Sequence, residues 1–179
     1  MISLRLCSFV AVLALCLSVR PSPTEEKKPS QLVTRDRIQL NLAGAEMIVA
    51  EVKKKAGEMK LKVNVAVVDD GGHLLAFARM DGARPASGYT AITKAITAAT
   101  FRQETGPLPT KGQPDVLLNL SLQNAASSGG GKLTTLKGGV PVVVEGQVIG
   151  AVGVGGGSGE QDVEVAKAGV KKLLDALKK

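Results

Sequence analysis

The stretch Val67–Phe77, VVDDGGHLLAF, decides the fold class, because it predicts two apolar strands joined by a tight turn. Gly71 and Gly72 tolerate the positive φ that a short hairpin turn needs. Val63–Val68 is rich in valine and predicts a strand that is buried on most of both faces. Leu74–Ala78 predicts the returning strand. The first part of the sheet is therefore expected to be an antiparallel hairpin.

A second hairpin is predicted nearer the carboxyl end. Val140–Val144 and Val148–Val154 are apolar runs, and Glu145-Gly146 supplies the turn between them. The next segment, GVGGGSG, precedes a predicted helix but lacks the Lys-Ser/Thr pair and the spacing of a nucleotide-binding loop. Two interpretations of it stay open: a generic anion nest, or a turn in which two backbones approach closely.

Apolar residues at helical spacing predict four helices around these hairpins. The first precedes the first hairpin, with Thr34 as its cap and an apolar stripe from Ile38 to Met59. Two helices lie between the hairpins, and the last follows the second hairpin. The two helices between the hairpins are predicted over Gly88–Phe101, with Ser87 as cap, and over Asp115–Ala125. The last helix is predicted from its apolar stripe, which consists of Val163, Ala166, Val170, Leu173 and Leu177. This order predicts an antiparallel α+β sandwich, not a βαβ nucleotide-binding fold.

The helix predicted over Gly88–Phe101 carries small side chains, among them Ala91, Ala95 and Ala98. They allow a flat ligand or another backbone to come close, and packing against the sheet of the same chain explains them equally well. Together with Gly150–Gly157, they also permit self-association.

The amino-terminal residues have the layout of a secretory signal peptide. Arg5 ends a short basic segment, and Leu6–Leu17 is an apolar run too short for a comfortable transmembrane helix. We expect residues 1–19 to be a signal peptide, residues 20–35 a flexible polar tether, and residues 36–179 the folded domain. The mature protein would then be secreted or periplasmic. The alternative is an uncleaved signal segment, which would be the only contact with a membrane.

Composition excludes several classes of site. Both cysteines, Cys7 and Cys16, lie in the predicted signal peptide, so the mature domain offers no disulfide, zinc–thiolate site or cysteine nucleophile. The formal net charge is +7, but lysine runs on predicted helix faces account for much of it and favour a solvated surface. With three Phe, one Tyr and no Trp, the chain has few residues that stack on bases. We expect no nucleic-acid binding.

Four motifs occur in order over Leu40–Leu174, nearly the whole domain. They are VVDDGGHLLAFARMDGA, then Ser87, Ala91, Lys94-Ala95 and Thr97-Ala98, then GGVPVVVEGQVIGAVGV, and finally Gln161-Asp162. Together they resemble the HbpS/GlcG family, described as haem-binding or haem-degrading and similar to the carboxyl-terminal domain of PduO proteins. Gly155-Gly156 departs from that family, which commonly has Ser-Gly there. The resemblance implies a five-stranded antiparallel sheet flanked by helices, assembly into homo-oligomers, and haem binding in some members.

Haem iron accepts His, Met or Tyr, and the side chains of these types near the motifs are His73, Met80 and Tyr89. His73, the only histidine, is the candidate metal ligand. The cations that can pair with haem propionates are Arg79, Arg84 and Lys94. An alternative stays open for His73: a partly exposed residue just after a turn, without a ligand.

Two functional hypotheses follow. The first is an exported protein that binds haem, a related tetrapyrrole or another small ligand, as a scavenger or sensor module. The second is an enzyme that acts on haem or a small metabolite. The sequence favours binding, because one histidine and no cysteine leave few nucleophile–base pairs in the mature domain. We therefore name no catalytic residue. A purely structural oligomer is a third interpretation.

Overall fold

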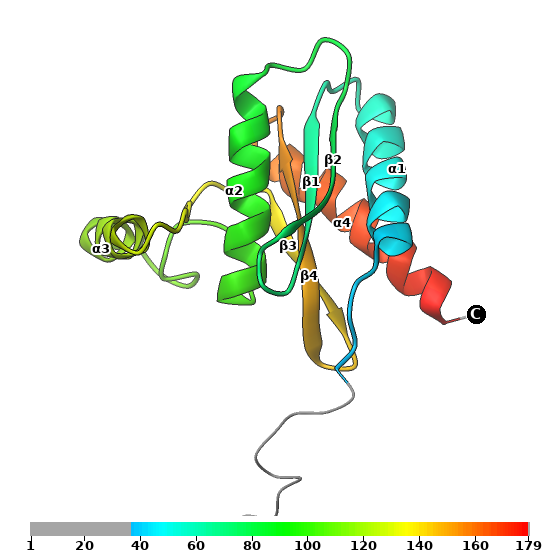
Figure 1. Cartoon of the computed structure of the whole chain (residues 1–179). Coiled ribbons are helices and arrows are strands. Elements are labelled where there is room, and N and C mark those ends of the chain that lie inside the picture. Colours follow the sequence, from blue (N-terminus) through cyan, green and yellow to red (C-terminus); the bar gives the residue numbers. More distant parts are fainter. Residues whose placement is uncertain (1–36, 179) are drawn as a thin grey trace, which may run out of the picture. The chain divides into compact units, whose positions relative to one another are not determined.

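The computed structural model describes residues 37–178 of the chain. The predicted signal peptide, the tether and the cap at Thr34 lie outside these residues. Figure 1 shows the arrangement of the helices and strands in the described part. In chain order they are α1 (Leu42–Glu58), β1 (Asn64–Asp69), β2 (Leu74–Arg79), α2 (Ala86–Phe101), α3 (Val116–Ser128), β3 (Gly139–Val144), β4 (Gln147–Gly155) and α4 (Gly159–Leu177).

The strands form one antiparallel sheet in the order β2-β1-β4-β3. The two predicted hairpins are its halves, and they join where β1 pairs with β4, with Val67 opposite Val152. The expected antiparallel α+β architecture is confirmed. The sheet has four strands in the described residues instead of the expected five, since the long segment between α2 and β3 forms α3 and irregular chain.

Helices cover both faces of the sheet. Figure 1 shows α1 and α4 on one face and α2 on the other, in agreement with their packing contacts. Branched aliphatic side chains fill the core under α1 and α4, including the fully buried Ile48, Val52, Val65, Val152 and Val165. The core under α2 consists mainly of Ala66, Val68, Ala91, Ala95, Ala98, Ala99 and Ala151. The sheet therefore has a thick layer on one side and a thin, alanine-rich layer on the other.

The thin layer brings α2 very close to β4. A Cβ atom added at Gly153 would lie 2.1 Å from the Ala91 carbonyl oxygen and 2.5 Å from the Ala95 amide nitrogen. A Cβ added at Gly155 would lie 2.6 Å from the Ser87 carbonyl oxygen. The small residues thus serve the packing of α2 on the sheet of its own chain, which is one of the two interpretations offered by the sequence.

The starts of the helices differ from prediction by a few residues. Asn41 caps α1 by accepting a hydrogen bond from a first-turn N–H group. The predicted cap at Ser87 is wrong, because α2 begins at Ala86, two residues before the predicted start at Gly88, and has no side-chain cap. Ser158 and Gln161 form a reciprocal capping box at the start of α4. A polar side chain therefore caps the start of α1 and of α4, whereas α2 begins without one.

Helix α3 lies beside α2, away from the sheet (Figure 1). Its start is capped by Asp115, and none of its residues is buried. The exposed apolar side chains of α3 are Val116, Leu117, Leu118 and Leu120. Within residues 37–178, no helix combines the length and the apolar character needed to cross a bilayer.

Candidate functional site

The turn between β1 and β2 presents His73 to solvent. The Asp69 carboxylate accepts hydrogen bonds from the N–H groups of Gly71 and His73, at 2.9 and 2.8 Å, and so holds the turn. The His73 side chain is 83% exposed, and its Nδ1 lies 3.3 Å from the same Asp69 oxygen. The carboxylate therefore lies next to the imidazole ring, and Nε2 has no partner among the described residues.

The other candidate iron ligands lie elsewhere. Met80 is half-buried against the core under α1 and α4. Tyr89 is 78% exposed on α2. Arg79 ends β2 opposite Asn64, at the far end of the hairpin from His73. Within residues 37–178, no group of three or more His, Cys, Asp or Glu side chains is placed to hold a metal ion.

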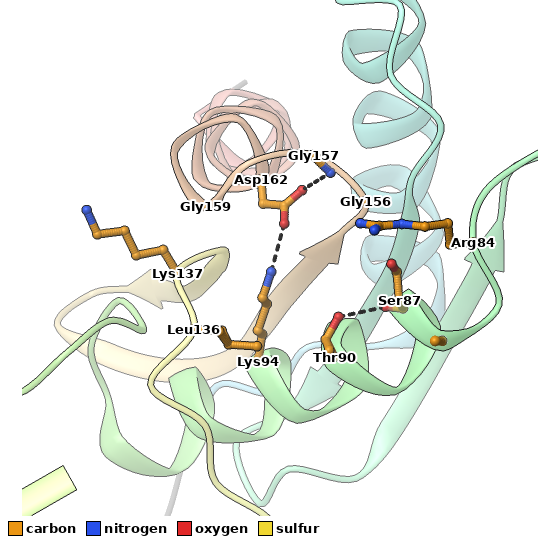
Figure 2. Close-up of a pocket in the computed structure, with 11 residues that line it drawn as sticks. Arg84, Ser87, Thr90, Lys94, Leu136, Lys137, Gly156, Gly157, Gly159 and Asp162 are labelled. Carbon is orange, nitrogen blue, oxygen red and sulfur yellow. Dashed lines mark hydrogen bonds and ion pairs between the residues drawn. The ribbon is translucent and has the colours of Figure 1, made fainter. Parts of the chain in front are cut away.

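A cavity of about 360 Å³ lies between the N-terminal ends of α2 and α4. Figure 2 shows that its side chains come from segments far apart in the sequence. Its lining residues are Arg84, Ala86, Ser87, Thr90, Lys94, Leu136, Lys137, Gly156, Gly157, Gly159 and Asp162. Arg84 and Lys94 are the two predicted cofactor-binding residues that the fold brings together here.

A buried ion pair between Lys94 and Asp162 lies in this cavity. Lys94 Nζ lies 2.7 Å from Asp162 Oδ2 and donates a second hydrogen bond to the Val154 carbonyl oxygen at 2.8 Å. Asp162 Oδ1 accepts a hydrogen bond from the Gly157 N–H at 2.9 Å. The two side chains are only 5% and 3% exposed. Both charges are therefore compensated, as burial requires, while one of the three ammonium N–H groups has no partner among the described residues.

Two more cations line the cavity. Lys137 Nζ lies 3.0 Å from Glu160 Oε1, and this hydrogen bond lowers the pKa of the Glu160 carboxyl. Arg84 forms no ion pair within the described range. The fully buried Asn64 donates a hydrogen bond from Nδ2 to the Arg84 carbonyl oxygen at 3.0 Å and so anchors this part of the chain. Because Lys94 and Lys137 are each paired with a carboxylate, the Arg84 guanidinium is the uncompensated positive charge among the described residues that line the cavity.

The glycine-rich segment before α4 is a close-approach turn. Gly156 has a φ of +150°, and a Cβ atom there would lie 2.5 Å from the Lys62 carbonyl oxygen. The next N–H group, on Gly157, is taken by Asp162 of the same chain. The turn interpretation of GVGGGSG is therefore confirmed for these residues.

Sequence reasoning missed Asp162 as a site residue, although it ends the quoted Gln161-Asp162 motif. One signal could have found it. Lys94 follows Ala91 at helical spacing and precedes Ala95, so a charged residue lies on the face that packs against the sheet. A buried lysine requires a carboxylate or several acceptors, and an acidic residue in the first turn of the last helix is a suitable partner.

Comparisons with known proteins agree with this fold. The family model described as haem degrading protein HbpS-like matches residues 40–171. Protein GlcG of Escherichia coli strain K12 is 43% identical over 120 residues, which are 67% of this chain and 84% of GlcG. The structure of a PduOC haem complex has a TM-score of 0.65 at 29% identity and covers 75% of this chain and 95% of its own. A double mutant of HbpS from Streptomyces reticuli has a TM-score of 0.63 at 29% identity, covering 84% of this chain and 97% of its own. The chain belongs to the haem degrading protein HbpS-like family.

Proposed function

We propose that this protein is exported and binds haem or a related tetrapyrrole, as a scavenger or sensor module. The observation that carries the proposal is the similarity to the PduOC haem complex, which extends over 95% of that chain. The name of the matching family points to the same ligand.

The surroundings of His73 fit a haem ligand. A histidine that binds a metal usually donates its other ring N–H to a carboxylate or a carbonyl group, which fixes the ring and its tautomer. A small rotation of the exposed ring would let Nδ1 donate to Asp69 Oδ1, which lies 3.3 Å away, and would leave Nε2 for iron. When bound, haem would supply the iron centre, and this chain would supply the imidazole and its orientation.

Apolar side chains next to His73 support the same assignment. Leu74 and Phe77 pair with Val68 and Ala66, which belong to the core under α2, so all four side chains point to the α2 face of the sheet. Leu74 is 52% exposed and Phe77 is 42% exposed. An edge strand with exposed apolar residues beside an exposed imidazole offers a surface against which a flat, apolar macrocycle can lie.

We predict that His73→Ala abolishes or shifts the Soret band of the haem complex without unfolding the protein. An exposed side chain of this kind contributes within about 0.5 kcal/mol to stability, so loss of the band would report loss of the ligand. An absorption titration of the purified mature protein with haem measures this. Met80→Leu and Tyr89→Phe are compared in the same titration, because Met80 and Tyr89 are the other candidate iron ligands. If His73→Ala leaves the haem titration unchanged, His73 is not the iron ligand and the turn has only a structural role.

The same titration separates binding from turnover. The description of the family as haem degrading favours an enzyme that acts on haem as the second candidate. If the complex is stable, its Soret band stays constant over hours in the presence of a reductant and air. Decay of the band, with an open-chain product found by chromatography, would favour the enzyme.

We predict that the native protein is found outside the cytoplasm and lacks about its first 18 to 22 residues, as the basic segment and the apolar run at the amino terminus suggest. Cell fractionation followed by amino-terminal sequencing tests this. A protein that keeps Met1 in a soluble cytoplasmic fraction would contradict export, and a protein that keeps Met1 in the membrane fraction would support the uncleaved anchor.

The proposal includes self-association. The alanine face of α2 and the glycines of β4 are occupied within the chain, so they are not the surface for a second copy. Among the described residues, the exposed apolar side chains of α3 and the second edge strand, β3 with its exposed Val143, remain for such a contact without covering the proposed haem surface. A homo-oligomer would cover them.

A further inference from the structure

We infer that the cavity between the N-terminal ends of α2 and α4 binds a small organic monocarboxylate, at a site separate from the proposed haem surface. Its volume of about 360 Å³ lies within the range of small-molecule pockets. The lining combines cations and hydroxyl groups with the apolar side chains of Ala86 and Leu136. A ligand with one charged end and a short apolar part matches this lining.

The donors in the cavity suit an anion. Lys94 is buried, and one of its N–H groups has no partner among the described residues. Arg84 lines the same cavity without an ion-pair partner in the described range, and Figure 2 shows its side chain extending toward Gly156. Arginine presents two parallel N–H groups that match the two oxygens of a carboxylate. Gly159, the first residue of α4, adds the positive end of a helix dipole.

The charge balance favours a carboxylate over phosphate or a metal ion. Asp162 compensates Lys94, and Glu160 compensates Lys137, so one positive charge remains on Arg84. A monoanion neutralises this charge. A phosphate dianion would leave an excess negative charge next to the buried Asp162 carboxylate, and a cation would meet the ammonium and guanidinium groups first.

This site does not depend on the haem proposal. Arg79 and Asn64 pair at the cavity end of the hairpin, and His73 lies at the other end of β1. The five residue steps of β1 span about 16 Å at the usual rise per residue. Failure of haem binding and failure of carboxylate binding can therefore be observed separately.

The test is an NMR titration in which sodium butyrate is added to the ¹⁵N-labelled full-length chain in the absence of haem. The amide resonances of Gly157 and Gly159 report binding. Inorganic phosphate and sodium chloride at matched ionic strength are the comparison anions. We expect saturable shifts with butyrate, and weaker or no saturable shifts with the other two. Shifts with butyrate no larger than those with chloride, or tighter binding of phosphate, would overturn the inference.

Arg84→Gln is expected to weaken butyrate binding at least about tenfold, because it removes a charge-assisted hydrogen-bonded pair. Arg79→Gln is the matched control, since Arg79 is exposed near the same end of the sheet but does not line the cavity. His73→Ala should bind butyrate like the unchanged chain. An equal loss in Arg79→Gln, or a loss in His73→Ala, would contradict a separate site at Arg84.

Discussion

Replacement of Lys94 by methionine is expected to lower the free energy of unfolding by about 3 to 5 kcal/mol, the usual cost of breaking a buried ion pair on one side. Methionine fills much of the space of the lysine side chain but leaves the Asp162 carboxylate buried without its cation. The Val154 carbonyl oxygen also loses its hydrogen bond from Nζ. Equilibrium unfolding in urea, followed by circular dichroism, gives the difference directly.

The double variant Lys94→Met with Asp162→Leu is the control for this prediction. Removing both charges takes away the uncompensated carboxylate, and apolar replacements of a buried pair are often neutral in stability. We therefore expect the double variant to recover part of the loss, because the Gly157 N–H group and the Val154 carbonyl oxygen stay without their partners. If the single variant is as stable as the unchanged chain, the pair is not buried in solution as it is in the structure.

Gly153→Ala is expected to destabilise the fold by about 3 kcal/mol or more, beyond the common range for overpacking, because the new methyl group meets backbone and not a movable side chain. Its Cβ would lie 2.1 Å from the Ala91 carbonyl oxygen. Helix α2 would have to move away from β4, which would open the alanine-rich core and displace Lys94. Thermal unfolding and urea unfolding of the variant measure the loss.

Gly57→Ala is the matched control for a glycine-to-alanine change. Gly57 lies in the last turn of α1, and a Cβ atom there meets nothing within 4 Å. Alanine favours a helix over glycine by up to about 1 kcal/mol, so this variant is expected to be slightly more stable. Similar effects of the two substitutions would show that the close contact between α2 and β4 does not limit stability.

Local sequence patterns predict most of the elements correctly. The turn glycines and the valine runs predict both hairpins, and the strand ends agree within one residue. The apolar stripe of the last helix is confirmed at Ala166, Val170 and Leu173, whereas Leu177 is exposed. These predictions succeed because a hairpin or an amphipathic helix is specified by residues that are neighbours in the chain.

The candidate site was only partly predictable. The sequence marks six side chains that can hold haem, but chemical type does not say which of them lie together. Arg84 and Lys94 share a cavity, whereas His73 lies at the other end of the first hairpin. The sequence also leaves open whether the alanines of α2 serve a ligand or the sheet, since both uses require the same small residues.

The sequence by itself determined the antiparallel α+β class, the order of the elements, and the glycine turn that precedes the only histidine. Only the tertiary structure decided that the alanine face of α2 packs on β4 and that Lys94 meets Asp162, 68 residues further along the chain. The physical reason is that the pair depends on burial and on the approach of the middle of α2, where Lys94 lies, to the first turn of α4, where Asp162 lies. Both arise when distant segments pack on one sheet, and the local periodicity of the sequence does not predict which distant segments pack together.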